Sequence, residues 1–113
     1  MIGGKKIRFI ILYGSFAKVK KTPTSDIDIA VYYDDSVKER FTFRMNILGR
    51  VCDKFDIQTF QDLPIYVQRE VLRGKVIYYD NNRFIYDITR KTNQDFDDFK
   101  LKLYDYIGGG VIA

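Results

Sequence analysis

The stretch YGSFAKVKKTPTSDIDIAV, residues 13–31, decides both the fold and the chemistry of this chain. Two aspartates separated by one residue, Asp26 and Asp28, stand at the start of a hydrophobic run. In an extended strand they share one face, whereas the isoleucines that follow each of them share the other. Carboxylates this close repel each other unless a cation or a proton lies between them. Because Mg²⁺ is held by one or two carboxylates together with substrate phosphates, the pair indicates a magnesium site.

The segment before the aspartates supplies a place for a phosphate group. Gly14 permits a sharp turn after a strand predicted at residues 7–13, and Ser15 opens a short helix predicted at residues 15–21. Free backbone N–H groups at a helix start, with a hydroxyl and lysines beside them, bind phosphate. The spacing is not that of a Walker A loop, because Val19 stands where its second glycine would be. Alone, the aspartate pair would be interpreted as facing water, whereas the neighbouring turn favours a site for a metal and a nucleotide.

Composition limits the chemistry that the chain can perform. The 113 residues include no histidine and one cysteine, Cys52, so Ser-His-Asp and Cys-His mechanisms are excluded and a zinc site is disfavoured. A single cysteine cannot form an internal disulfide, which fits a cytoplasmic protein. No apolar run approaches the roughly 18 residues that span a bilayer, so no membrane association is predicted. The net charge of +4 favours an anionic partner only weakly, and a solvated basic surface is the favoured interpretation.

The rest of the chain predicts one α/β (α+β) domain with a mixed sheet of about four strands flanked by helices. Apolar runs and alternation predict strands at residues 7–13, 26–33, 55–60 and 75–79, with a loop at 22–25. Helices are predicted after the DDS sequence at 34–36, at 64–72 and at about 83–106. The domain is expected to cover residues 1–107, and a flexible Gly-rich tail to cover residues 108–113.

Two apolar rows at helical spacing follow the DDS sequence, and core packing is predicted for both. The main row consists of Val37, Phe41, Met45, Leu48 and Cys52, and the second of Phe43, Ile47 and Val51. The last helix carries a further row, which consists of Phe96, Phe99, Leu103 and Tyr106, with Tyr104 nearby. Packing of this row onto the sheet is the favoured interpretation, and a docking face for another protein is the alternative.

The order of these features resembles a known family. Gly14-Ser15, ten residues and then the D-x-D of Asp26 and Asp28 are similar to the signature of the minimal nucleotidyltransferases, small relatives of DNA polymerase β and kanamycin nucleotidyltransferase. The family has a third carboxylate on a later strand, and Asp56 in KFDIQTF fits it. The stretch DLPIYVQREVLRGKVIYYDN, residues 62–81, looks like the helix and strand that follow in the family.

The resemblance implies transfer of a nucleoside monophosphate from an NTP to a hydroxyl, with release of pyrophosphate. Asp26 and Asp28 would hold two magnesium ions, and Asp56 would complete one metal site and help to activate the hydroxyl. Many members of the family read G-S-x-A-R-G, where this chain has Lys18 and Val19, and lysine supplies charge without a two-pronged contact. The candidate nucleotide-binding residues are Gly14, Ser15, Lys18 and Ser25.

Single domains of this size resemble the antitoxins of toxin–antitoxin pairs whose toxins are HEPN-domain ribonucleases. In that family the antitoxin transfers AMP from ATP to a tyrosine of the toxin, so a magnesium-dependent adenylyltransferase with a HEPN-type partner is expected. One alternative is an antitoxin that neutralises the toxin by contact alone. Another is a nucleotidyltransferase subunit for RNA or a small molecule; RNA is compatible with the basic surface but not favoured. Small domains with exposed apolar faces also pair, which leaves a homo-oligomer open.

Overall fold

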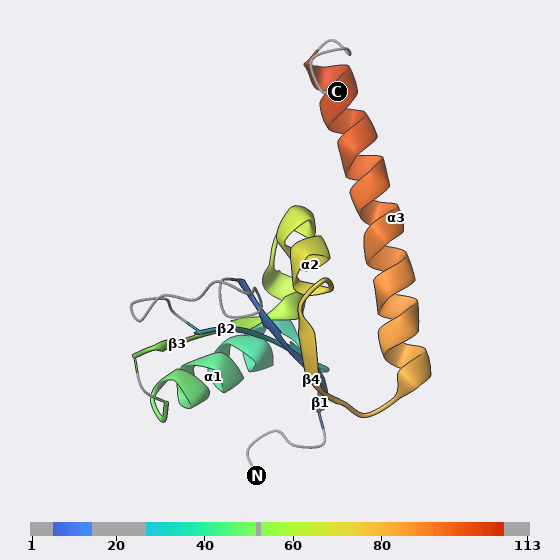
Figure 1. Ribbon diagram of the computed structural model, residues 1–113. Helices are drawn as coiled ribbons and strands as arrows, with labels where there is room; N and C mark the ends of the chain where they lie inside the picture. The colour runs from blue at the N-terminus through green and yellow to red at the C-terminus, as the bar shows by residue number, and fades with distance from the viewer. Residues whose placement is uncertain (1–5, 15–26, 52, 108–113) are drawn as a thin grey trace.

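A computed structural model describes residues 6–14, 27–51 and 53–107 (Figure 1). In these residues four strands form one sheet in the order β3-β2-β1-β4, and they are β1 (Ile7–Tyr13), β2 (Ile27–Tyr33), β3 (Phe55–Thr59) and β4 (Lys75–Tyr79). The helices of the described residues are α1 (Val37–Leu48), the short 3₁₀ helix η2 (Phe60–Asp62), α2 (Ile65–Val71) and α3 (Asn82–Tyr106). The predicted order of strands and helices in these ranges is confirmed. The helix predicted at 15–21, the loop at 22–25 and the tail at 108–113 lie outside the described residues.

The directions of the strands bring distant parts of the chain to one end of the sheet. β1 is antiparallel to both β2 and β4, whereas β2 and β3 are parallel. A parallel pair needs a crossover connection, and α1 lies within it. The end of β1 therefore lies beside the starts of β2 and β3. The turn at Gly14 and two of the predicted carboxylates, Asp28 and Asp56, consequently meet at one end of the sheet.

Helices cover both faces of the sheet (Figure 1). On one face, α2 and the first turns of α3 pack over a buried cluster that consists of Phe9, Ile11, Ala30, Phe60 and Val71. On the other face, α1 packs over Val31, Tyr33, Phe43 and Ile57. Both clusters contain aromatic rings, and Tyr33 and Phe43 stack with their centroids 4.1 Å apart. The sheet is thus the middle layer of three.

The prediction that the main apolar row of α1 packs in the core is wrong for its first three residues, whereas Leu48 at the end of the helix does pack against the core. Val37 is 66% exposed and Phe41 61%, whereas Phe43 is buried. The helix starts as predicted, because the Ser36 side chain accepts a hydrogen bond from the Glu39 N–H. Two arginines explain the rotation of the helix. They are Arg40 and Arg44, which lie on the same side of the helix as the buried Phe43. Arg40 binds the Asp62 carboxylate and Arg44 binds the Ile57 carbonyl, so this side carries both polar and apolar residues although it faces inward.

The predicted packing of the α3 row onto the sheet is also wrong. The first turns of α3 pack on the core through Phe84 and Ile88, and Thr92 is buried at 4% exposure. Beyond this point the helix projects past the sheet (Figure 1), and Tyr106 is 87% exposed. The reason is length, because 25 helical residues extend about 37 Å and the strands are much shorter. In the described segments no helix has the length and apolarity needed to cross a bilayer.

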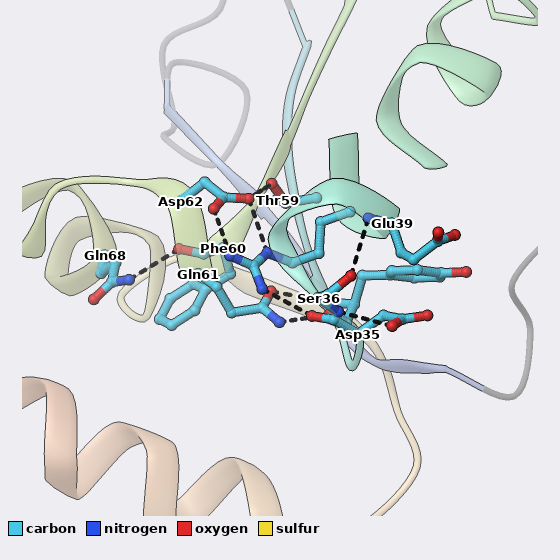
Figure 2. Close-up of polar contacts among 10 residues, drawn as sticks. Asp35, Ser36, Glu39, Thr59, Phe60, Gln61, Asp62 and Gln68 are labelled. Carbon is cyan, nitrogen blue, oxygen red and sulfur yellow. Dashed lines mark hydrogen bonds and ion pairs between the residues drawn. The ribbon is translucent and has the colours of Figure 1, made fainter. Parts of the chain in front are cut away.

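A polar network closes the end of the sheet away from the turn after β1 (Figure 2). The Arg40 guanidinium donates to both carboxylate oxygens of Asp62, over 2.7 and 3.0 Å, and to the Asp35 carbonyl over 2.8 Å. The Gln61 side chain binds the backbone N–H and carbonyl of Tyr33. We call these residues the Arg40–Asp62 network. It attaches η2 to β2 and α1, and thereby fixes the chain that leaves β3.

Candidate functional site

The candidate site lies where β1 ends and where β2 and β3 begin. The parallel register pairs Asp28 directly with Asp56, and the antiparallel register pairs Asp28 with Tyr13. Neighbouring strands lie about 4.8 Å apart, and paired residues point to the same face. Three side chains from separate parts of the sequence therefore stand side by side across three strands. Two of them are the carboxylates that the sequence singled out.

Gly14 forms the turn that follows Tyr13, as predicted. Its φ of +74° lies in the left-handed region, which side chains other than glycine rarely adopt. A Cβ atom built on Gly14 would lie 2.1 Å from the Oδ2 atom of Asp28. The backbone of the turn thus runs directly against the carboxylate. Only glycine allows this turn and this approach together, so any group bound by the turn lies next to Asp28.

Tyr13 contributes a protonated hydroxyl to the site. Burial, together with the negative charges of Asp28 and Asp56, raises the pKa of Tyr13 to about 12. The hydroxyl therefore keeps its proton at neutral pH. Sequence analysis missed Tyr13, although the alternation of β1 places it on the face of Phe9 and Ile11, and it directly precedes the turn.

The carboxylate of Asp56 is held by its own strand. The Gln58 Nε2 atom donates to Asp56 Oδ1 over 3.0 Å. Residues two apart in a strand share one face, so the sequence is consistent with this contact. Between them, the Ile57 carbonyl accepts a hydrogen bond of 2.7 Å from Arg44 Nε of α1. Both the backbone and the side chain of this part of β3 are therefore fixed.

Three predicted site residues, Gly14, Asp28 and Asp56, are described and lie together. The other four lie outside the described residues, and their roles stay predictions; they are Ser15, Lys18, Ser25 and Asp26. Within the described ranges, no group of three or more His, Cys, Asp or Glu side chains could hold a metal ion. The described donor set is a pair of carboxylates on adjacent strands. Hard oxygen ligands of this kind suit Mg²⁺, which completes its coordination with water and substrate phosphates.

Comparison with known proteins gives matches in sequence and in structure. Residues 2–83 match the model of the family described as polymerase beta, nucleotidyltransferase. The chain is 42% identical over 76 residues to an inferred protein adenylyltransferase of Methanocaldococcus jannaschii. The matched part is 66% of this chain and 58% of the relative, so the chain spans little more than half of the length of that protein.

Solved structures with the same fold come from toxin–antitoxin complexes. A mutant of the toxin–antitoxin MntA–HpeT is similar with a TM-score of 0.74 and 18% identity, over 93% of this chain and 86% of the other. A toxin–antitoxin with AMP-PNP has a TM-score of 0.74 and 19% identity, over 90% and 84%. A complex of a tri-AMPylated Shewanella oneidensis HEPN toxin with its MNT antitoxin has a TM-score of 0.67 and 18% identity, over 90% and 81%. At this identity the likeness establishes the fold.

Proposed function

Because this chain belongs to the polymerase beta nucleotidyltransferase family, we propose that it is an antitoxin that transfers AMP from ATP to a tyrosine hydroxyl of a HEPN-type ribonuclease toxin. The observation that carries the proposal is the pairing of Asp28 with Asp56 beside the left-handed turn at Gly14. The M. jannaschii relative, an inferred protein adenylyltransferase, supports the reaction class. The complex of an AMPylated HEPN toxin with an MNT antitoxin, which shares the fold, supports the acceptor.

Each site residue has a role in this proposal. Asp28 and Asp56, together with Asp26, would hold two Mg²⁺ ions, which would neutralise triphosphate charge and favour ionisation of the attacking hydroxyl. Gly14 and Ser15 bind the β- and γ-phosphates through the turn. The further proposed contacts to the nucleotide are Lys18 and Ser25.

Asp56 is the proposed acceptor of the hydroxyl proton. The tyrosine oxygen of the toxin forms a bond to the α-phosphorus, and the bond from this phosphorus to the bridging oxygen breaks, so that pyrophosphate leaves. The paired strands hold Asp56 next to Asp28 before substrate binds. Most of the rate enhancement then comes from positioning and from charge neutralisation. Tyr13, which keeps its proton, can donate toward the carboxylates but cannot act as a base.

Inhibition by contact alone is a second candidate function, and the projecting end of α3 supplies a surface for it. The side chains of Leu103, Tyr104 and Tyr106 are exposed there on a helix that leaves the domain. Exposed apolar side chains gathered in one place indicate a binding surface for another protein. Such a surface would also serve an enzyme that must hold a protein substrate, so it does not by itself separate the two functions.

An intact-mass measurement separates catalysis from contact. The neighbouring gene's product is incubated with this protein, ATP and Mg²⁺, and its mass is compared before and after. We expect a gain of one or more AMP units, which is lost when the Asp26→Ala, Asp28→Ala variant replaces the wild type. No gain, with a stable complex that still inactivates the ribonuclease, would instead establish an antitoxin that acts by contact.

A further inference from the structure

We propose that Gln58 is the positioning residue of Asp56, and that it fixes the carboxylate in the orientation needed to bind metal and accept a proton. This inference rests on the function proposed above. Gln58 Nε2 donates to Asp56 Oδ1 over 3.0 Å, a normal length for an N–H···O bond. Because Oδ1 accepts this bond, the plane of the carboxylate is set. Oδ2 then remains for the metal ion or the proton.

The sheet makes this bond possible. Residues two apart in a strand point to the same face, so Gln58 stands next to Asp56 on the face of the site. The parallel register pairs Gln58 with Ala30 of β2, whose methyl side chain is small. A larger residue at Ala30 would fill the space beside Gln58. With alanine there, the long glutamine side chain has room to turn along its own strand toward Asp56.

The backbone between the two residues is held independently. Ile57 is buried against α1, and its carbonyl accepts the 2.7 Å hydrogen bond from Arg44. The side-chain torsions of Asp56 are the freedom that remains, and the Gln58 amide restricts them. Hydrogen-bond partners of this kind typically change metal affinity or activity by 10–100-fold when they are removed.

The charge of the hydrogen-bond donor matters as much as its position. At Asp62 the partner is the Arg40 guanidinium, whose positive charge neutralises the carboxylate. At Asp56 the partner is a neutral amide, which orients the carboxylate and leaves its negative charge available. A cation in place of Gln58 would compete with the metal ion for the same oxygen atoms. The choice of glutamine therefore fits a carboxylate that binds a cation from outside the chain.

The test compares two glutamines. Gln68 Nε2 also donates one hydrogen bond, to the Phe60 carbonyl over 2.9 Å, and is partly buried, but it lies away from the site. Gln58→Met and Gln68→Met each remove one such bond and keep the side-chain length. For each full-length variant, kcat and KM for ATP are measured with the neighbouring gene's toxin. Mn²⁺ is also titrated in the presence of α,β-methylene ATP, in which the α–β bridge cannot be cleaved.

We expect Gln58→Met to lower kcat by about 10–100-fold and to weaken Mn²⁺ binding, while KM for ATP changes about two-fold or less. Gln68→Met should leave kcat and Mn²⁺ affinity unchanged. If Gln58→Met does not fold, Gln58→Asn decides, since it keeps the amide but is one methylene too short to reach. Equal kcat and equal Mn²⁺ affinity in the Gln58 and Gln68 variants would overturn the inference.

The two proposals fail in different ways. If the wild type transfers no AMP, the proposed function fails, and Mn²⁺ affinity alone decides whether Gln58 positions Asp56. If the wild type transfers AMP and Gln58→Met does so at the same rate, the function stands and Gln58 has no positioning role. A wild type that binds no Mn²⁺ overturns the role of Gln58 at a metal site.

Discussion

The carboxylates at the two ends of the sheet have opposite kinds of neighbour. At the far end, Asp62 is bound by both arms of the Arg40 guanidinium, which holds the pKa of Asp62 below its ordinary value. At the end that holds the candidate site, Asp28 and Asp56 stand directly opposite each other on adjacent strands. The Arg40–Asp62 network thus uses a carboxylate to hold the fold together. The end of the sheet that holds the candidate site brings two like charges together, an arrangement that a bound cation would stabilise.

The largest expected effect is that of Asp56→Asn on catalysis. The variant keeps the shape of the side chain but removes the charge that binds metal and accepts the proton. We expect AMP transfer to fall by about 10³-fold or more. The melting temperature should stay the same or rise, because repulsion with Asp28 is relieved. The two readouts are transfer rate and thermal unfolding, and a large loss of stability would show that Asp56 belongs to the fold rather than to the site.

Gly14→Ala should damage both stability and activity. The φ of +74° costs an alanine about 1–2 kcal/mol, and the new Cβ atom would collide with the Asp28 carboxylate. Gly49→Ala is the matched control, because its Cβ would meet no atom closer than 3.6 Å and Gly49 has a negative φ of −74°. Chemical denaturation and transfer rate should separate the two variants. Equal stabilities would mean that the turn relaxes without strain.

Arg40→Met should weaken the fold and leave the site intact. Asp62 would lose its charged partner in a partly exposed setting and keep the hydrogen bond from the Thr59 hydroxyl, so we expect a loss of about 1–2 kcal/mol in the free energy of unfolding at pH 7. Because the folded-state pKa of Asp62 is lowered, the wild-type pair contributes stability above the unfolded pKa of about 4, and loses it as pH falls further. Urea unfolding at pH 7 and at pH 3 measures this, and the difference in the free energy of unfolding between variant and wild type should be smaller at pH 3. A difference that persisted at pH 3 would point to packing or to the hydrogen bond from Arg40 to the Asp35 carbonyl, rather than to the charge of Asp62.

The smallest expected effect on stability belongs to the exposed end of α3. Tyr106→Ser removes a side chain that is 87% exposed, so the free energy of unfolding should change by less than about 0.5 kcal/mol. Binding to the toxin is the informative measurement. If this end of α3 is the docking surface, the affinity of the variant for the toxin should fall while its free energy of unfolding stays the same. Unchanged affinity would place the contact elsewhere.

Local patterns were enough to predict the strands and most of the helix limits. The apolar runs of β1 and β4 and the caps at Ser36 and Asn81 are visible in the sequence, because each depends on neighbouring residues. The rotation of α1 could not be predicted in this way. It depends on Arg40 meeting Asp62, 22 residues away, and two arginines on an inward side contradict the usual reading of an amphipathic helix.

The site was predictable only in part, because it too depends on contacts between residues that are far apart in the sequence. The family resemblance supplied the reason to place Asp56 near Asp28, and strand alternation puts Gln58 on the same face as Asp56. The register that pairs these two aspartates is a property of the folded sheet. The same holds for Tyr13, whose raised pKa comes from burial and from two carboxylates on other strands. Contacts between strands decide the chemistry here, and a single sequence records them only indirectly.

The position of β3 at the edge of the sheet has a consequence for how the proposed acceptor arrives. In the order β3-β2-β1-β4, no further strand of the described chain lies beyond the one that carries Asp56. Among the described residues, therefore, no strand encloses the site on the side of β3. A tyrosine on the surface of another folded protein can approach Asp56 laterally without unfolding its own backbone. Access of this kind suits a macromolecular substrate, for which an enclosed site would be a barrier.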